Sequence, residues 1–265
     1  MTTFTVYNLV ALVSLLSAAL VPWRRSQAPD TCFWAALGLA LLVCMAWAVF
    51  QVEPAWSTGF ATALWLTIAA TLFAFVILVL LVHDAWRLAP LLLPYLLLLG
   101  LIATLWSQTA SASVPSETPF GWFAVHVAVS LATYVLVTLA AVAGAAVLVQ
   151  ERALKRRAPG RVSRSLPSIA DAERLEHRLL IAAEIILGLG IVTGMAAQFA
   201  ADGSLINIDH KTTFALAAFV VLGGLLIAQR LWGLRGRRAA RYVLVVYLLL
   251  TLAYPGVKFV TDVIL

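Results

Sequence analysis

Long apolar runs separated by short polar connections dominate the hydrophobicity pattern of this chain. Eight such runs can be recognised, at residues 5–23, 31–51, 59–82, 88–106, 121–149, 178–200, 210–230 and 240–262. A helix needs about 20 apolar residues to cross the hydrocarbon core of a bilayer, and each run has about that length. The pattern therefore predicts eight transmembrane helices.

The runs are rich in Leu, Ala and Val, and they do not alternate between apolar and polar positions. Continuous runs are typical of membrane helices, whereas the strands of an outer-membrane barrel alternate with a period of two. The composition agrees, because 63% of the 265 residues are apolar and only 11% are charged. We expect an all-α, polytopic protein of the lipid bilayer, with residues 1–265 in a single integral membrane domain.

The distribution of basic residues predicts the orientation. No basic residue precedes the first run, and Arg24 and Arg25 follow it, which is typical of a signal anchor and not of a cleaved signal peptide. If the N-terminus lies outside, 16 of the 18 Lys and Arg residues fall in cytoplasmic connections, and only Lys211 and Lys258 lie outside. The positive-inside rule thus predicts an N-out/C-out topology. It also explains the net charge of +6 without a nucleic-acid partner.

The longest polar connection extends from Gln150 to Arg178 and is strongly basic. Within it, Ser168-Ile169-Ala170-Asp171 follows Pro167 and has the pattern of a capping box. This pattern predicts that the sixth helix begins before its membrane-spanning run.

Histidines are the first candidates for chemistry. His83 and His177 are flanked by charged residues on the cytoplasmic side, where ordinary solvation explains them. His126 and His210 each begin a predicted membrane helix at the outer face. Two imidazoles at one depth could ligate a metal or a haem iron from opposite sides, although histidines at helix ends often have no such role.

Polar neighbours extend this candidate site. Tyr134 follows His126 and Ser130 at helical spacing, and Asp209 could accept a hydrogen bond from the imidazole of His210. Lys211 and Lys258 could pair with haem propionates, or they could simply reach the lipid headgroups.

Glu184 is the other candidate, because it falls within the sixth predicted membrane helix, where an ionised carboxylate is costly. A proton-relay role is conceivable. A hydrogen bond to a neighbouring helix is the simpler expectation.

Four segments resemble a known family. Trp122–Tyr134 is similar to a helix of the cytochrome c assembly family, CcsA/CcmC type, that carries the pattern His…Ser-Leu…Tyr. Ile208–Thr213, Trp232–Ala240 and Leu250–Val260 resemble later segments of that family in the same order, with Pro255 where Phe is usual. The resemblance covers about residues 60–265 and is greatest to the short eight-span branch called YpjD-like or HemX-like.

The resemblance implies a haem-handling protein of cytochrome c biogenesis in the bacterial cytoplasmic membrane. It implies haem b held between His126 and His210 as axial ligands, with Tyr134, Lys211 and Lys258 as further cofactor-binding residues, and with assembly components or an apocytochrome as partners. The family's tryptophan-rich motif is absent, because residues 200–210 read AADGSLINIDH without an aromatic residue. This departure affects haem delivery more than haem binding.

No nucleophile–base pair, phosphate-binding loop or carboxylate dyad is visible, and we do not expect an enzyme. The alternative is a haem-free membrane scaffold or regulator that acts on a partner protein through its basic cytoplasmic loop. A proton-coupled transporter that uses Glu184 is a third hypothesis.

Overall fold

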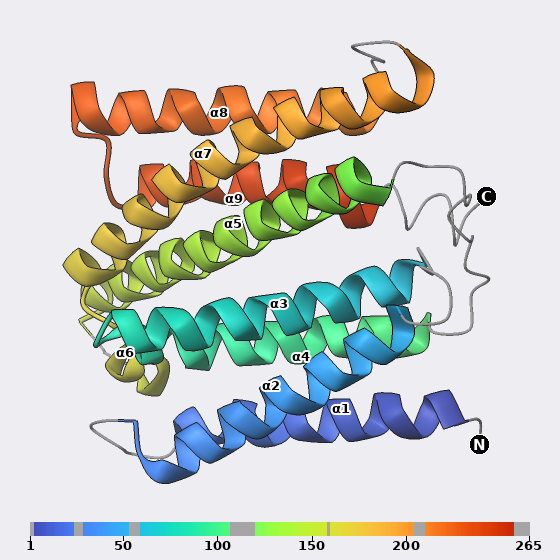
Figure 1. Ribbon diagram of the computed structural model, residues 1–265. Coiled ribbons are helices and arrows are strands. Elements are labelled where there is room, and N and C mark those ends of the chain that lie inside the picture. The colour runs from blue at the N-terminus through green and yellow to red at the C-terminus, as the bar shows by residue number, and fades with distance from the viewer. Residues whose placement is uncertain are drawn as a thin grey trace. The chain divides into compact units, whose positions relative to one another are not determined.

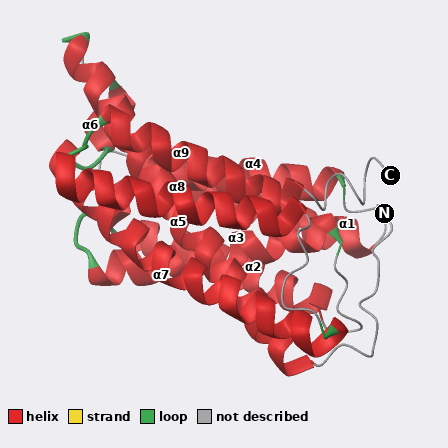
Figure 2. Ribbon diagram, turned by 90° about the horizontal axis from the view of Figure 1, so that it is seen from above, coloured by secondary structure: helices red, strands yellow, loops and turns green. Residues whose placement is uncertain are grey.

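The computed structural model describes residues 3–23, 29–52, 59–106, 120–157, 160–203 and 210–256, and within these residues a helix occurs in each of the eight predicted apolar runs. The helices that cover these runs are α1 (Thr3–Leu20), α2 (Thr31–Val52), α3 (Phe60–Leu81), α4 (Ala89–Leu105), α5 (Phe120–Lys155), α7 (Ile169–Asp202), α8 (His210–Trp232) and α9 (Arg237–Thr251). Shorter helical segments are η1 (Val21–Trp23), η2 (Ala85–Leu88), α6 (Arg161–Ser165) and a π-helical turn, η3 (Leu252–Gly256). Among the described residues there is no strand (Figure 2). The predicted all-α fold is confirmed.

Six helices in the described part of the chain are long and apolar enough to cross a membrane. They are Thr31–Gln51, Phe60–Leu81, Ala85–Leu105, Ala124–Lys155, Ile169–Phe199 and Thr212–Trp232. The apolar segment Thr5–Leu20 is shorter, and α9 has 15 residues before η3 continues it. The chain is therefore a polytopic helical membrane protein, whereas the count of eight spans and the orientation remain predictions.

The chain forms two compact units. The first contains Met1–Ser113 and Val149–Asp171, and thus α1 to α4 and α6. The second contains Val114–Leu148 and Ala172–Leu265, and thus most of α5 and α7 and all of α8 and α9.

In the first unit, α1 packs on α2 and α4, and α3 packs on the same two helices (Figure 1). Gly100 of α4 lies against side chains of α1 and α3. A Cβ atom there would lie 3.1 Å from Cδ2 of Leu12 and 3.3 Å from the fully buried ring of Trp65. A small residue lets helix backbones approach, which strengthens packing where lipid supplies no hydrophobic driving force.

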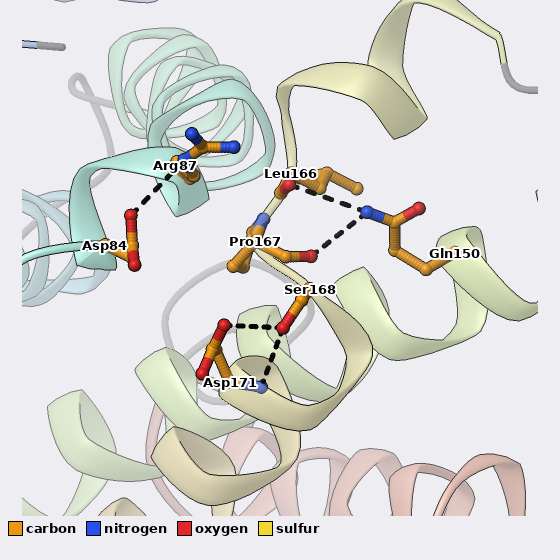
Figure 3. A network of polar contacts seen from close by, with 7 residues as sticks. All are labelled: Asp84, Arg87, Gln150, Leu166, Pro167, Ser168 and Asp171. Carbon is orange, nitrogen blue, oxygen red and sulfur yellow. Dashed lines mark hydrogen bonds and ion pairs between the residues drawn. The ribbon is translucent and has the colours of Figure 1, made fainter. Parts of the chain in front are cut away.

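At the start of α7, Ser168 forms the N-cap hydrogen bond that the predicted capping-box pattern requires of it (Figure 3). The Ser168 hydroxyl accepts a hydrogen bond from the backbone N–H of Asp171 at 3.2 Å and donates one to the Asp171 carboxylate. The helix accordingly begins at Ile169, nine residues before the apolar run that was predicted to cross the membrane.

Candidate functional site

His126 lies near the N-terminal end of α5, in the second unit, and its imidazole is half-buried against α7. Its Nδ1 atom is 3.1 Å from the backbone carbonyl oxygen of Gly190 and 3.4 Å from Oγ1 of Thr193. Thr193 itself donates its hydroxyl hydrogen to the same carbonyl oxygen, at 3.1 Å. The imidazole is thus held by α7 through one ring nitrogen.

Two glycines of α7 make room for the ring. Gly190 and Gly194 are four positions apart and so lie one above the other on one helix face. A Cβ atom at Gly194 would lie only 2.9 Å from Cε1 of His126. At Gly190 a Cβ atom would lie 3.5 Å from Cγ1 of Val129, one turn further along α5. The small-xxx-small spacing therefore brings α5 and α7 close together and leaves a notch for the imidazole.

The hydrogen bond to Gly190 determines which nitrogen of His126 is open to a ligand. A carbonyl oxygen can only accept, so Nδ1 carries the hydrogen and Nε2 keeps its lone pair. No residue in the described part of the chain hydrogen-bonds to Nε2. Histidine ligands of metals commonly have this arrangement, with one ring N–H donated to a carbonyl oxygen.

His210 is the first residue of α8. The structure does not describe the side chains of His210 and Lys211, and Asp209 and Lys258 lie outside the described residues. The pairing of His126 with His210 and the roles of the two lysines therefore stay predictions. Within the described residues, no group of three or more His, Cys, Asp and Glu side chains could hold a metal ion.

Tyr134 lies two turns after His126 on α5 and is buried. Its hydroxyl group is 3.1 Å from the hydroxyl oxygen of Tyr247 and 3.2 Å from Oγ1 of Thr251, both on α9. Sequence analysis missed these partners. The sequence did contain a pattern that could have indicated them, because Tyr247 and Thr251 are polar residues four positions apart in an apolar helix. The predicted contact of Tyr134 with a cofactor is not tested by these bonds.

Two carboxyl groups of α7 lie against glycines of other helices. A Cβ atom at Gly223 of α8 would lie 2.8 Å from Oε1 of Glu184, and one at Gly144 of α5 would lie 3.3 Å from Oε2 of Glu176. The other oxygen of each group, Oε2 of Glu184 and Oε1 of Glu176, is buried without a hydrogen-bond partner among the described residues. The expected hydrogen bond from Glu184 to a neighbouring helix is therefore not found there.

His177 was expected to be an ordinary solvated side chain. It instead contacts α8, where its Nδ1 atom is 2.6 Å from Oε1 of Gln229. Polar side chains of α7 therefore face α8 at two places, His177 at Gln229 and Glu184 at Gly223.

The basic connection between α5 and α7 is ordered by one side chain of the first unit. The Gln150 amide nitrogen donates to the carbonyl oxygens of Pro167 at 3.0 Å and Leu166 at 3.5 Å (Figure 3). It also donates to the Ser163 carbonyl oxygen at 2.9 Å. Its Oε1 atom accepts a hydrogen bond of 2.7 Å from the Ser163 hydroxyl. Beside this connection, Arg87 pairs with Asp84 at 3.4 Å. Gln150 thus anchors α6 and the segment that follows it.

Taken together, these features define a polytopic helical membrane protein in which α7 fixes the orientation of one histidine of α5. Comparison with known proteins agrees with this class: the Cytochrome C assembly protein family matches residues 33–265, and the chain belongs to that family. A 28.8 kDa protein of Azospirillum brasilense, described as an uncharacterized protein in the nifR3-like 5'region, is 50% identical over 265 residues, which cover 98% of each chain. No solved structure matches the chain.

Proposed function

We propose that this protein binds haem in the membrane as part of cytochrome c biogenesis, with Nε2 of His126 as one axial ligand of the iron. The observation that carries the proposal is the hydrogen bond from Nδ1 of His126 to the Gly190 carbonyl oxygen, because it leaves Nε2 as the open nitrogen. Membership of the cytochrome c assembly family supports haem as the cofactor.

The residues around His126 suit this role. The notch formed by Gly190 and Gly194 positions the ring from one side, and the fixed tautomer removes the need to reorient it on ligation. Bound haem would supply a metal centre that accepts an imidazole lone pair on each axial face. His210 would provide the second imidazole, and Lys211 and Lys258 would meet the propionates. Tyr134 would pack beside the porphyrin, although its hydroxyl group is engaged by α9.

In this proposal the protein binds and positions haem and does not catalyse the formation of a covalent bond. It would work in the bacterial cytoplasmic membrane at the outer face, in the YpjD-like or HemX-like branch of the family. Residues 200–210 lack the tryptophans with which other members present haem, so transfer to an apocytochrome would need a surface supplied by another assembly component.

An absorption spectrum tests the proposal. The purified protein is titrated with haemin, beside His126→Ala and His210→Ala, with His83→Ala as the matched control because His83 is exposed and far from α7 in sequence. We expect a Soret band in the wild type and in His83→Ala that is lost or shifted in the other two variants. A wild type that stays colourless after haemin addition would refute haem binding. Loss in His126→Ala alone would refute His210 as the partner.

A second candidate function is a haem-free scaffold that acts through the basic connection between α5 and α7. The observation in its favour is the order that Gln150 gives to this connection, with Arg156, Arg157 and Arg164 left exposed. The wild type would then not bind haem, and substitution of these arginines by Glu would release a partner protein.

A further inference from the structure

Helix α7 carries two acidic side chains inside the second unit that have no counter-ion among the described residues. Glu176 is 2% exposed, and its Oε1 atom is buried without a hydrogen-bond partner there. Glu184 lies two turns later, and its Oε2 atom is also buried without a hydrogen-bond partner among the described residues. An ionisable group inside a membrane helix is costly and is retained mostly where it has a function.

The surroundings of Glu176 are small and apolar. A Cβ atom placed at Gly144 of α5 would lie 3.3 Å from Oε2 of Glu176 and 3.4 Å from the Cβ of Ala240 on α9. The Glu176 carboxyl group thus lies next to two small residues, Gly144 and Ala240. The charged residues nearest to Glu176 in sequence are Arg174 and Arg178 on α7, with Glu173 one position further away, and Arg237 and Arg241 lie close to Ala240 in the sequence of α9. All four arginines are exposed, and Glu176 forms no ion pair among the described residues.

Glu184 faces a different helix. Its Oε1 atom lies against Gly223 of α8, and no titratable residue occurs on α8 from Thr212 to Gln229. The nearest titratable residues before it on α7 are Arg178, which is exposed, and His177, which contacts Gln229. On α5, Val129 and Gly144 both face α7, and Tyr134 is the titratable residue between them. Its hydroxyl group is bonded to α9.

We propose that α7 binds two exchangeable protons, one on the carboxyl group of Glu176 and one on that of Glu184. A carboxylate transferred from water to such surroundings would lose its hydration without gaining a donor or a cation. The neutral acid avoids this cost. The helix can therefore take up or release one proton beside the apolar run predicted to cross the membrane, at Glu176, and one within that run, at Glu184, whether or not the protein binds haem.

Infrared spectroscopy of the full-length protein in lipid nanodiscs tests this proposal. The wild type at neutral pH shows the C=O stretching band of a protonated carboxyl group, which shifts in D₂O because the proton exchanges. Glu176→Gln and Glu184→Gln each remove about half of this band, and the double variant removes all of it. The matched control is Glu173→Gln on the same helix, which leaves the band unchanged. A wild type without the band, or a band that the two substitutions leave unchanged, overturns the proposal.

Stability against pH provides the second measurement, and its sign follows from linkage. A glutamate in the unfolded chain is ionised at neutral pH, so a folded state that keeps the proton binds more protons, and stability falls as the pH rises. The double Gln variant, which imitates the neutral acids, therefore matches the wild-type melting temperature only near about pH 4, where the unfolded glutamates are also protonated, and exceeds it by a margin that grows as the pH rises through about 7. Stabilisation of the wild type by NaCl over choline chloride, together with a missing acid band, would instead indicate a bound sodium ion and refute the proposal.

Labelling of the unmodified protein avoids any effect of substitution on folding. Dicyclohexylcarbodiimide reacts with protonated carboxyl groups in apolar surroundings, and Glu184 is the more accessible of the two. Mass spectrometry should find the adduct on Glu184 and none on Glu173 at neutral pH. The reverse distribution contradicts the proposal.

Discussion

The Nδ1 atom of His126 lies 3.1 Å from the carbonyl oxygen of Gly190, and this contact joins α5 to α7 across 64 residues of sequence. It gives one histidine of this chain a defined tautomer. The contact depends on Gly194 one turn further on, where a side chain would collide with the imidazole.

Replacing Gly194 by Ala should therefore weaken haem binding. The new Cβ atom would lie 2.9 Å from Cε1 of His126 and displace the ring from its hydrogen bond. Loss of such an orienting contact typically reduces metal affinity about 10–100-fold. Haemin titration followed at the Soret band measures the change.

Gly188→Ala is the matched control for that experiment. Its Cβ atom would meet Cε2 of Phe219 at 3.4 Å, which is an ordinary contact, and we expect wild-type affinity. Equal affinity in Gly194→Ala and the wild type would show that the notch does not position the ligand.

Acid should release haem from the protein. An imidazole ligates iron only as the neutral base, and an unperturbed histidine takes up a proton at about pH 6.5. Binding is therefore complete at neutral pH and is lost as the pH falls, with the Soret band lost near about pH 5. A spectrum that stays constant down to this pH would exclude histidine ligation.

Tyr134→Phe should lower the stability of the second unit. The substitution keeps the ring and removes the hydroxyl group that bonds Tyr247 and Thr251. Hydrogen bonds between membrane helices contribute about 0.6 kcal/mol each on average, so we expect a loss of about 1 kcal/mol and a lower melting temperature. Haem affinity is measured in parallel, because a large fall in affinity with unchanged stability would instead place the hydroxyl group at the cofactor.

Gln150→Leu should loosen the basic connection of the first unit. It removes the amide that donates to Ser163 and Pro167. We expect trypsin to cleave after Arg161 and Arg164 several-fold faster, because local opening becomes more frequent. Ser165→Ala is the control, since its hydroxyl group bonds only the nearby Val162 carbonyl oxygen. Equal rates in both variants and the wild type would show that Gln150 does not hold the connection.

Sequence patterns predicted the local features of this protein because their causes are local. Apolar runs long enough to cross a bilayer predicted where the helices lie, since every backbone polar group in lipid must be bonded within the helix. The Ser168–Asp171 pattern predicted the start of α7 because a cap involves only residues of the first turn. His126 stood out for the same reason, as a polar residue near the start of an apolar helix.

The contacts between helices could not be predicted in this way. His177 and Glu176 are neighbours in the sequence and share one flanking pattern of charges, yet one bonds Gln229 and the other is buried against Gly144. Their environments differ because adjacent residues point about 100° apart on a helix and so meet different neighbours.

The sequence by itself thus determined the helices, their membrane character and the residues available for chemistry. Only the tertiary structure decided that Nδ1 of His126 bonds Gly190, that Tyr134 bonds α9, and that Glu176 and Glu184 of α7 each have one buried carboxyl oxygen without a partner among the described residues. The physical reason is that periodicity places a side chain on a face of its own helix, whereas its partner is chosen by the rotation and close approach of another helix. In this chain that approach depends on single glycines, such as Gly194 and Gly144, and the sequence does not tell which of its glycines face a neighbouring helix.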